Sequence, residues 1–458
     1  MPDLLAKKPL NIIMQEAEEG GEHSLRRALG PTNLISLGIG AIIGTGIFVL
    51  TGTASAMHAG PAIILSFCLA ALACVFAGLC YAEFASMIPV AGSAYTYGYA
   101  TLGEFVAWII GWDLILEYAL GAATVASGWS GYVLSLLGDL GIRVSPMLAG
   151  APGTKFVLYH GHWERLAGIA KKLAVEHIDP ASLQTTTSSF NLFGFLGIAL
   201  VTVILVIGIK ESANFTTAYI GFDAVSTAAQ EAKNPARDMP IGILGSLAIC
   251  TVLYITVAAV LTGLVKYTNL DVPDPIAIGI DVTGVRWGSM LVKLGAICGL
   301  SSTMVVMLLG QSRVFFSMSR DGLLPAWASK VHPRFRTPYL STIFVGLCVA
   351  LAGALTPINV LGEMVSIGTL LAFIIVCAGV WVLRARGTEV KRAFVTPWVP
   401  FTPIMGIVIS AAMMYSLATA TWIRLVVWLA IGLVIYFAYS RKHSKVQQGH
   451  PEEVLQTH

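Results

Sequence analysis

The stretch GIGAIIGTGIF, residues 38–48, lies inside the uncharged apolar segment 34–57. About 20 apolar residues suffice to cross a bilayer as a helix, so the segment is long enough to span. It carries four glycines within nine positions: Gly38, Gly40, Gly44 and Gly46. Glycine readily leaves helical geometry, and in hydrocarbon non-helical backbone persists only where it lines a cavity or is buried in protein. The segment therefore predicts a broken first helix whose freed N–H groups face an anionic ligand near mid-membrane. Close helix packing through small residues four apart is the alternative.

The composition is that of a protein embedded in a bilayer. Of the 458 residues, 56% are hydrophobic and only 12% are charged, and the mean hydropathy is +0.77. Soluble domains carry about 25% charged residues, so we expect an all-α polytopic membrane protein. The seven cysteines lie in apolar runs without a CxxC pair, which predicts small buried side chains and no metal, cofactor or disulfide framework. No phosphate loop, nucleophile elbow or nucleic-acid-binding face is recognisable, which argues against an enzyme and a nucleic-acid partner.

Ten apolar segments are expected to form spans. They are 34–57, 61–87, 105–120, 190–209, 241–264, 288–312, 339–355, 363–383, 401–419 and 424–439. Basic residues concentrate before the first span, after the last one and in the loop that follows residue 312, and such residues mark the cytoplasmic side. We therefore expect cytoplasmic segments at 1–30 and 441–458, a transmembrane domain at 31–440 and an outer loop at 138–189. Four residues in that loop have helical spacing and predict a short amphipathic helix: Trp163, Leu166, Ile169 and Leu173.

The order of the spans leaves a gap. The segment 190–209 ends on the cytoplasmic side and 241–264 begins there, so an even number of crossings must lie between them. The apolar piece 218–229 covers less than about 20 Å as a helix, too little to span. This part of the chain has room for no crossing or for a re-entrant half-helix, not for two spans.

Three carboxylates in apolar surroundings are candidate functional groups, because a charge in the membrane interior costs about 2.5–3.5 kcal/mol on insertion scales. Asp113 and Glu117 are four positions apart and share a helix face. We expect Glu117 to accept a substrate amine or to carry a proton, and Asp113 to form a polar cross-link to a neighbouring helix. Asp223 follows Gly221 in the predicted half-helix and suits amine or cation recognition, or a capping role. Three further charged residues are expected to reach the membrane interface: Glu83, Lys293 and Arg313.

Three motifs together resemble the amino acid–polyamine–organocation transporters, and within them the bacterial relatives of the cationic amino acid transporters. They are GIGAIIGTGIF (38–48), AYIGFDAVSTAAQEAKNPARDMPIGI (218–243) and GQSRVFFSMSRDGLLP (310–325). The resemblance implies a LeuT-type fold of 12 spans with inverted repeats and with spans 1 and 6 broken at the substrate. It also implies that about 40 residues of this pattern, span 5 and the first half of span 6, are missing before Ala218, by the length of a span and a half plus a loop. The lysine that span 5 supplies in proton-coupled members has no counterpart here.

The resemblance also implies the substrate site. Backbone N–H groups at Ile43, Gly44, Thr45 and Gly46 would bind the substrate carboxylate, and span 6 would contribute Ala218, Ile220 and Asp223. Glu117 would line the site from span 3, and Met307 would border the side-chain pocket, although plain packing explains Met307 equally well.

The expected function is secondary active transport of amino acids across the plasma membrane, with protons as the coupling ion and a small single-span subunit as a candidate partner. An amino acid or amine exchanger is the alternative within transport. A non-transporting amino acid sensor, or a membrane subunit that depends on a partner, is the alternative outside it.

Overall fold

The computed structural model describes residues 4–9, 12–13, 30–88, 93–166, 169, 173, 176–207, 232–335, 337–386 and 392–449. Within these residues, all ten segments expected to span the membrane are helical, which confirms a polytopic helical protein. Six helical stretches are long and apolar enough to cross a membrane by length and composition, and three shorter apolar helices accompany them.

The first span consists of α2 (Pro31–Ile42), a π-helical turn η1 (Gly46–Leu50), α3 (Thr51–Ala54) and a second π-helical turn η2 (Ser55–Ala59). The long helices that follow are α4 (Ile63–Met87), α6 (Glu104–Asp139), α8 (Leu192–Ile207), α11 (Pro235–Leu264), α13 (Arg286–Arg320), α14 (Tyr339–Leu355), α15 (Ile358–Ala385), α16 (Phe401–Tyr415) and α17 (Thr419–Ile435). Shorter elements are η3 (Gly60–Ala62), α5 (Ser93–Thr101), η4 (Pro146–Leu148), η5 (Pro180–Ser182), η7 (Tyr267–Asn269), α12 (Pro275–Asp281), η8 (Ala326–Ser329), η9 (Tyr436–Ser440) and α18 (Arg441–His443). Proline stands at the first position of α2, α11 and α12, where its missing N–H is not needed.

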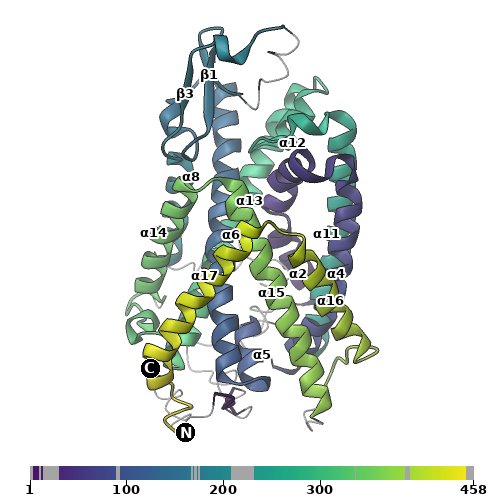
Figure 1. The fold of residues 1–458 in the computed structure, drawn as a ribbon, viewed down its shortest axis with the longest axis vertical. Helices are drawn as coiled ribbons and strands as arrows, with labels where there is room; N and C mark the ends of the chain where they lie inside the picture. The colour runs from purple at the N-terminus through teal and green to yellow at the C-terminus, as the bar shows by residue number, and fades with distance from the viewer. Residues whose placement is uncertain are drawn as a thin grey trace.

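Helix α6 runs through the middle of the bundle and packs against α13, α15, α8 and α14 (Figure 1). Glycines allow its neighbours to approach closely. A Cβ built on Gly310 of α13 would lie 3.3 Å from the ring of Tyr118, and one built on Gly121 of α6 would lie 3.4 Å from Met307 Sδ. On another side, Trp112 stacks on Trp428 of α17 with ring centroids 4.5 Å apart. The central helix that carries Asp113 and Glu117 is thus held from several directions.

The loop at residues 138–189 contains a small antiparallel sheet at one end of α6 (Figure 1), formed by β1 (Lys155–Tyr159), β2 (His162–Arg165) and β3 (Thr185–Thr187) in the order β2-β1-β3. The predicted amphipathic helix is wrong at its start, because Trp163 lies in β2 opposite Leu158. Leu166, Ile169 and Leu173 are helical, and the last two are buried against the sheet, where they contact β1 rather than a membrane surface. We call this end of the molecule the sheet end and the opposite end, where α5 lies, the α5 end.

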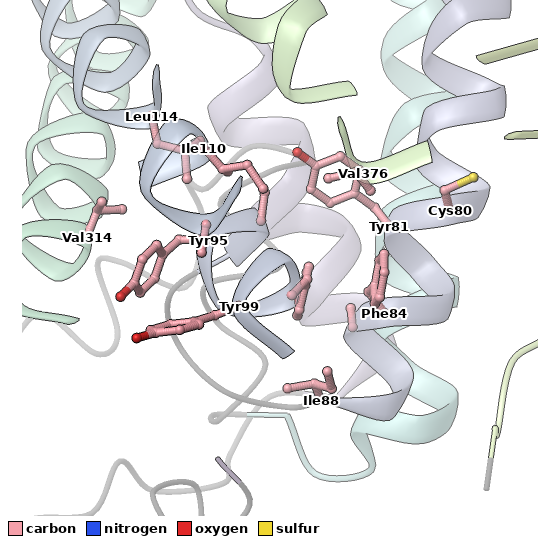
Figure 2. Close-up of a cluster of buried hydrophobic side chains, with 14 of the residues drawn as sticks. Cys80, Tyr81, Phe84, Ile88, Tyr95, Tyr99, Ile110, Leu114, Val314 and Val376 are labelled. Atoms are coloured by element: carbon pink, nitrogen blue, oxygen red, sulfur yellow. The ribbon is translucent and has the colours of Figure 1, made fainter. Parts of the chain in front are cut away.

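Buried aromatic side chains fill the α5 end. Figure 2 shows Tyr95 and Tyr99 of α5 with their hydroxyl groups pointing the same way, beside a cluster of buried apolar residues. The Tyr95 hydroxyl donates to Asp321 at 2.6 Å, and Lys8 forms an ion pair of 2.7 Å with the same carboxylate. The backbone N–H of Lys445 donates to the Asp321 carbonyl at 3.2 Å. Both terminal segments therefore meet at this end.

Two of the charged residues expected at the membrane interface are buried and paired. Glu83 is fully buried and accepts two hydrogen bonds from Arg384, at 2.9 and 3.0 Å. Lys293 is 2% exposed and lies 2.6 Å from Asp139. In each case another helix supplies the opposite charge, and a position at the membrane interface stays a prediction for both residues.

The cysteines depart from the expectation in part. All seven are free, but Cys68, Cys298 and Cys348 are exposed rather than buried. Cys80 and Cys377 are buried in the core at the α5 end.

Candidate functional site

The first helix is broken where the glycine pattern predicted it. Helix α2 ends at Ile42, and Ile43 leaves helical geometry with φ −77° and ψ 70°. The N–H of Gly44 turns back to the Ile42 carbonyl at 2.8 Å, and helical structure resumes at Thr45. The break consists of Ile43 and Gly44.

The break exposes hydrogen-bond donors at the start of a half-helix. The first N–H groups of a helix have no partner within it, and here they belong to Thr45, Gly46 and Ile47, of which Ile47 donates to the Tyr254 hydroxyl. The positive end of the helix dipole lies at the same place, so the arrangement suits an anion such as a carboxylate. The break also lets Gly44 approach α13, since a Cβ there would lie 3.0 Å from Thr303 Cγ2. Close packing and a broken helix, which the sequence offered as alternatives, therefore occur together.

Met307 lies one helical turn beyond Thr303 on α13. It is half-buried and its sulfur faces Gly121 of α6. The residue therefore lies at the α6–α13 contact, just below the break in the direction of the α5 end.

Glu117 and Asp113 form a second group on α6. The hydroxyl of Thr369, on α15, donates to Glu117 Oε1 at 2.7 Å. Gly368 makes room for the pair, because a Cβ there would lie 3.3 Å from Asp113 Oδ1. Asp113 is fully buried, and neither of its carboxyl oxygens has a hydrogen-bond partner in the part of the chain that the structure describes. The expected cross-link through Asp113 is therefore wrong.

The break and the Glu117–Asp113 pair lie at different heights along α6. Gly128 of α6 faces the second half of the broken helix, with a Cβ position 3.3 Å from Thr45 Cγ2. Glu117 stands 11 positions earlier on α6, which corresponds to about 16 Å along the helix axis. The structure brings the break together with Thr303 of α13. Met307 lies one turn further toward the α5 end, beside Gly121, and Glu117 follows one turn beyond Gly121 in the same direction.

The remaining predicted site residues, Ala218, Ile220 and Asp223, lie outside the described residues, as does the segment in which crossings were expected to be missing. Within the described ranges, no group of three or more His, Cys, Asp or Glu side chains is arranged to hold a metal ion.

Tyr254 also lies at the break, although it is not among the predicted site residues. Its hydroxyl, on α11, donates to the Ile42 carbonyl at 2.5 Å. A lone tyrosine in an apolar helix carries no local signal for such a role, because the partner is 212 positions away in the sequence.

Comparison with known proteins agrees with the geometry. A sequence model of the family described as amino acid permease matches residues 29–220 and 213–443. The branched-chain amino acid permease BcaP of Bacillus subtilis (strain 168) is 45% identical over 456 residues, covering 94% of this chain and 97% of that protein. The methylthioribose transporter of the same organism is 41% identical over 464 residues, covering 97% and 99%. The vacuolar cationic amino acid transporter 4 of Arabidopsis thaliana is 29% identical over 579 residues, covering 97% and 96%.

These three relatives are permeases or transporters by name, and the family match covers most of the chain in two stretches that overlap at residues 213–220. The chain therefore belongs to the amino acid permease family of the amino acid–polyamine–organocation superfamily, whose members are membrane transporters and not enzymes.

Proposed function

We propose that the protein carries amino acids across the plasma membrane by alternating access, on a LeuT-type framework with both termini in the cytoplasm. The observation that carries the proposal is the break at Ile43–Gly44, which places the N–H groups of Thr45 and Gly46 at the positive end of a half-helix. A substrate carboxylate matches such donors. Of the relatives' named substrates, the amino acids have a carboxylate and methylthioribose lacks one, which favours amino acids here.

In this proposal the backbone N–H groups of Thr45 and Gly46 bind the carboxylate. Those of Ile43 and Gly44 donate to the Ile39 and Ile42 carbonyls and form the turn before them. Met307 borders the side-chain pocket, since it lies one turn from Thr303, which contacts the break. Three further residues complete the site on the segment 218–229, with carbonyl groups near the first of them receiving the amine: Ala218, Ile220 and Asp223.

Glu117 is the proposed proton carrier of a symport mechanism and lines the lower end of the substrate path. A proton gradient can drive transport only if an ionisable group changes its protonation when access changes. Glu117 is half-buried, is hydrogen-bonded to Thr369, and has Asp113 one turn away on the same face.

The test is uptake of radiolabelled L-leucine and L-arginine into proteoliposomes with and without an inward proton gradient. We expect uptake of at least one of them to rise with the gradient, and Glu117→Gln to abolish that rise. Uptake that requires preloaded amino acid would show an exchanger, and binding without flux would show a sensor or a partner-dependent subunit. Competition by methylthioribose but by no amino acid would contradict the proposed substrate class.

The proposed absence of span 5 and the first half of span 6 is supported by the family match, whose two stretches meet at residues 213–220. Intact mass spectrometry of the protein expressed from its native gene tests it. A mass near 48.6 kDa would establish the gap, and we would then test binding before transport. A mass larger by about 4–5 kDa, the size of a span and a half plus a loop, would show that the natural chain contains the segment and would restore a lysine candidate for coupling.

A further inference from the structure

Tyr254 contacts both sides of the break in the first span, which we call helix 1: its first half is α2, and its second half begins at Thr45. Its hydroxyl donates to the Ile42 carbonyl at 2.5 Å, and the same carbonyl accepts the Gly44 N–H at 2.8 Å. Ile42 is the last residue of α2, so this carbonyl is one of those that a helix end leaves without an internal partner. On the other side of the break, a Cβ at Gly46 would lie 2.4 Å from the Tyr254 hydroxyl oxygen. Only glycine leaves room for the phenol at this point.

The ring of Tyr254 has little freedom to leave this position. The rings of Tyr254 and Phe67, on α4, form a T-shaped contact with their centroids 5.2 Å apart. Nearer the start of α11, Gly245 lets Ile35 of α2 approach closely, because a Cβ built on Gly245 would lie 3.0 Å from the Ile35 side chain. The first half of helix 1 therefore packs against α11 at Ile35 and is hydrogen-bonded to it at Ile42.

The second half of helix 1 is fastened to different elements. The hydroxyl of Tyr132, on α6, donates to the Phe48 carbonyl at 2.7 Å. Gly128 of α6 packs against Val49, with a Cβ position 2.6 Å from its Cγ2 atom. At the sheet end, Gly52 packs against Pro275 of α12. The break thus lies between a half that packs on α11 and a half that packs on α6 and α12, and the Tyr254 phenol bridges the two.

We propose that Tyr254 is a positioning residue for the substrate site. Its hydroxyl donates to the carbonyl at which α2 ends and accepts from the Ile47 N–H, so it holds the turn at Ile43–Gly44 and sets the direction of the donors at Thr45 and Gly46. Without that bond the Ile42 carbonyl loses one of its two donors, and the turn samples orientations in which the N–H groups no longer converge on one anion. The role in substrate binding rests on the proposed function, whereas the role in ordering the break does not.

Hydrogen exchange measured by mass spectrometry tests the ordering of the break without any substrate. Tyr254→Phe keeps the ring and removes only the hydroxyl, and Tyr132→Phe is a matched control that removes the equivalent bond within the second half. We expect amide exchange over residues 42–47 to become at least about tenfold faster in Tyr254→Phe and to stay unchanged in Tyr132→Phe. Unchanged exchange in the first variant, or an equal increase in both, would overturn the proposal.

Uptake kinetics test the role in binding, with L-leucine and L-arginine as probes in proteoliposomes. We expect Tyr254→Phe to raise KM about tenfold while kcat changes less than twofold, because bound substrate reorders the donors. An unchanged KM, or a loss of kcat alone, would mean that Tyr254 orders the break without positioning substrate donors. If the unmodified protein neither binds nor transports either probe, the proposed function fails, and the exchange experiment still decides whether Tyr254 orders the break.

A double-mutant cycle guards against a general folding defect. Gly46→Ala places a methyl group on the Tyr254 hydroxyl, and Tyr254→Phe removes the atom it would meet. We expect the double variant to bind L-leucine more tightly than Gly46→Ala alone. Strictly additive losses would contradict direct contact between the two positions.

Discussion

Replacing Glu83 by glutamine removes the negative charge from a buried cluster that joins α4 to α15 near the α5 end. The Glu83 carboxylate is fully buried and accepts four hydrogen bonds or ionic contacts. Arg384 donates to both of its oxygens at 2.9 and 3.0 Å, the Thr396 N–H donates at 2.9 Å, and Arg392 lies 3.7 Å away. Bidentate contact of this kind is the strong form of an arginine–carboxylate pair.

The size of the effect follows from the burial. Removing one partner of a buried ion pair costs about 3–5 kcal/mol, because the other charge stays desolvated without compensation. The Arg384 side chain is 22% exposed, so water recovers part of that loss, and glutamine retains one acceptor oxygen. We therefore expect Glu83→Gln to lower the free energy of unfolding by about 3 kcal/mol, the lower end of the range.

Glu363 provides the matched control. It pairs with Arg424 at 3.5 Å, and the two side chains are 33% and 38% exposed. Exposed pairs contribute about 0–1 kcal/mol, so Glu363→Gln should cost less than about 1 kcal/mol. Both variants can be unfolded by denaturant in detergent micelles, with tryptophan fluorescence as the signal and linear extrapolation to zero denaturant. Equal losses in the two variants, or a loss below about 1 kcal/mol for Glu83→Gln, would refute the reasoning.

Three further predictions use the same unfolding assay. Asp113→Asn should leave the free energy of unfolding unchanged or raise it, because the buried carboxyl group has no partner among the described residues; a loss above about 2 kcal/mol would reveal one. Gly52→Ala should cost about 1–3 kcal/mol, since its Cβ would lie 2.4 Å from Pro275. Gly295→Ala, with nothing within 4 Å of its Cβ position, should instead raise the free energy of unfolding by up to about 1 kcal/mol. A loss of stability in both glycine variants, or a gain in both, would contradict these two predictions. Burial raises the pKa of Asp274 despite a nearby arginine, so the folded state holds that proton more tightly than the unfolded chain. Stability should therefore fall as the pH rises above about 4, and this slope should be shallower in Asp274→Asn; identical slopes would disprove it.

Some features of the site are local, and the sequence alone was sufficient to predict them. The glycines at positions 38–46 predicted the break, because a helix that lacks Cβ atoms at closely spaced positions has little to oppose a turn there. The position of Glu117 on an apolar helix followed from hydropathy and helical period. The helical character of the ten apolar segments followed in the same way.

Other features depend on which helices meet, and these were missed or mistaken. Asp113 was expected to form a cross-link and has none among the described residues, whereas the buried ion pairs of Glu83 and Lys293 were not predicted. Strand β2 was expected to be helical, since its pairing with β1 is not visible in a helical spacing of apolar residues.

The sequence by itself determined where the chain is apolar, where its backbone can break and which side chains are charged within the membrane. Only the tertiary structure decided the partners, because each pair joins residues far apart in the chain: Glu83 and Arg384 are 301 positions apart, and Tyr254 and Ile42 are 212 apart. Hydropathy and helical period define each helix separately, but the register in which two helices pack depends on every side chain along their contact. The donors at the break follow from local sequence, and the phenol that we propose holds them in place follows from packing.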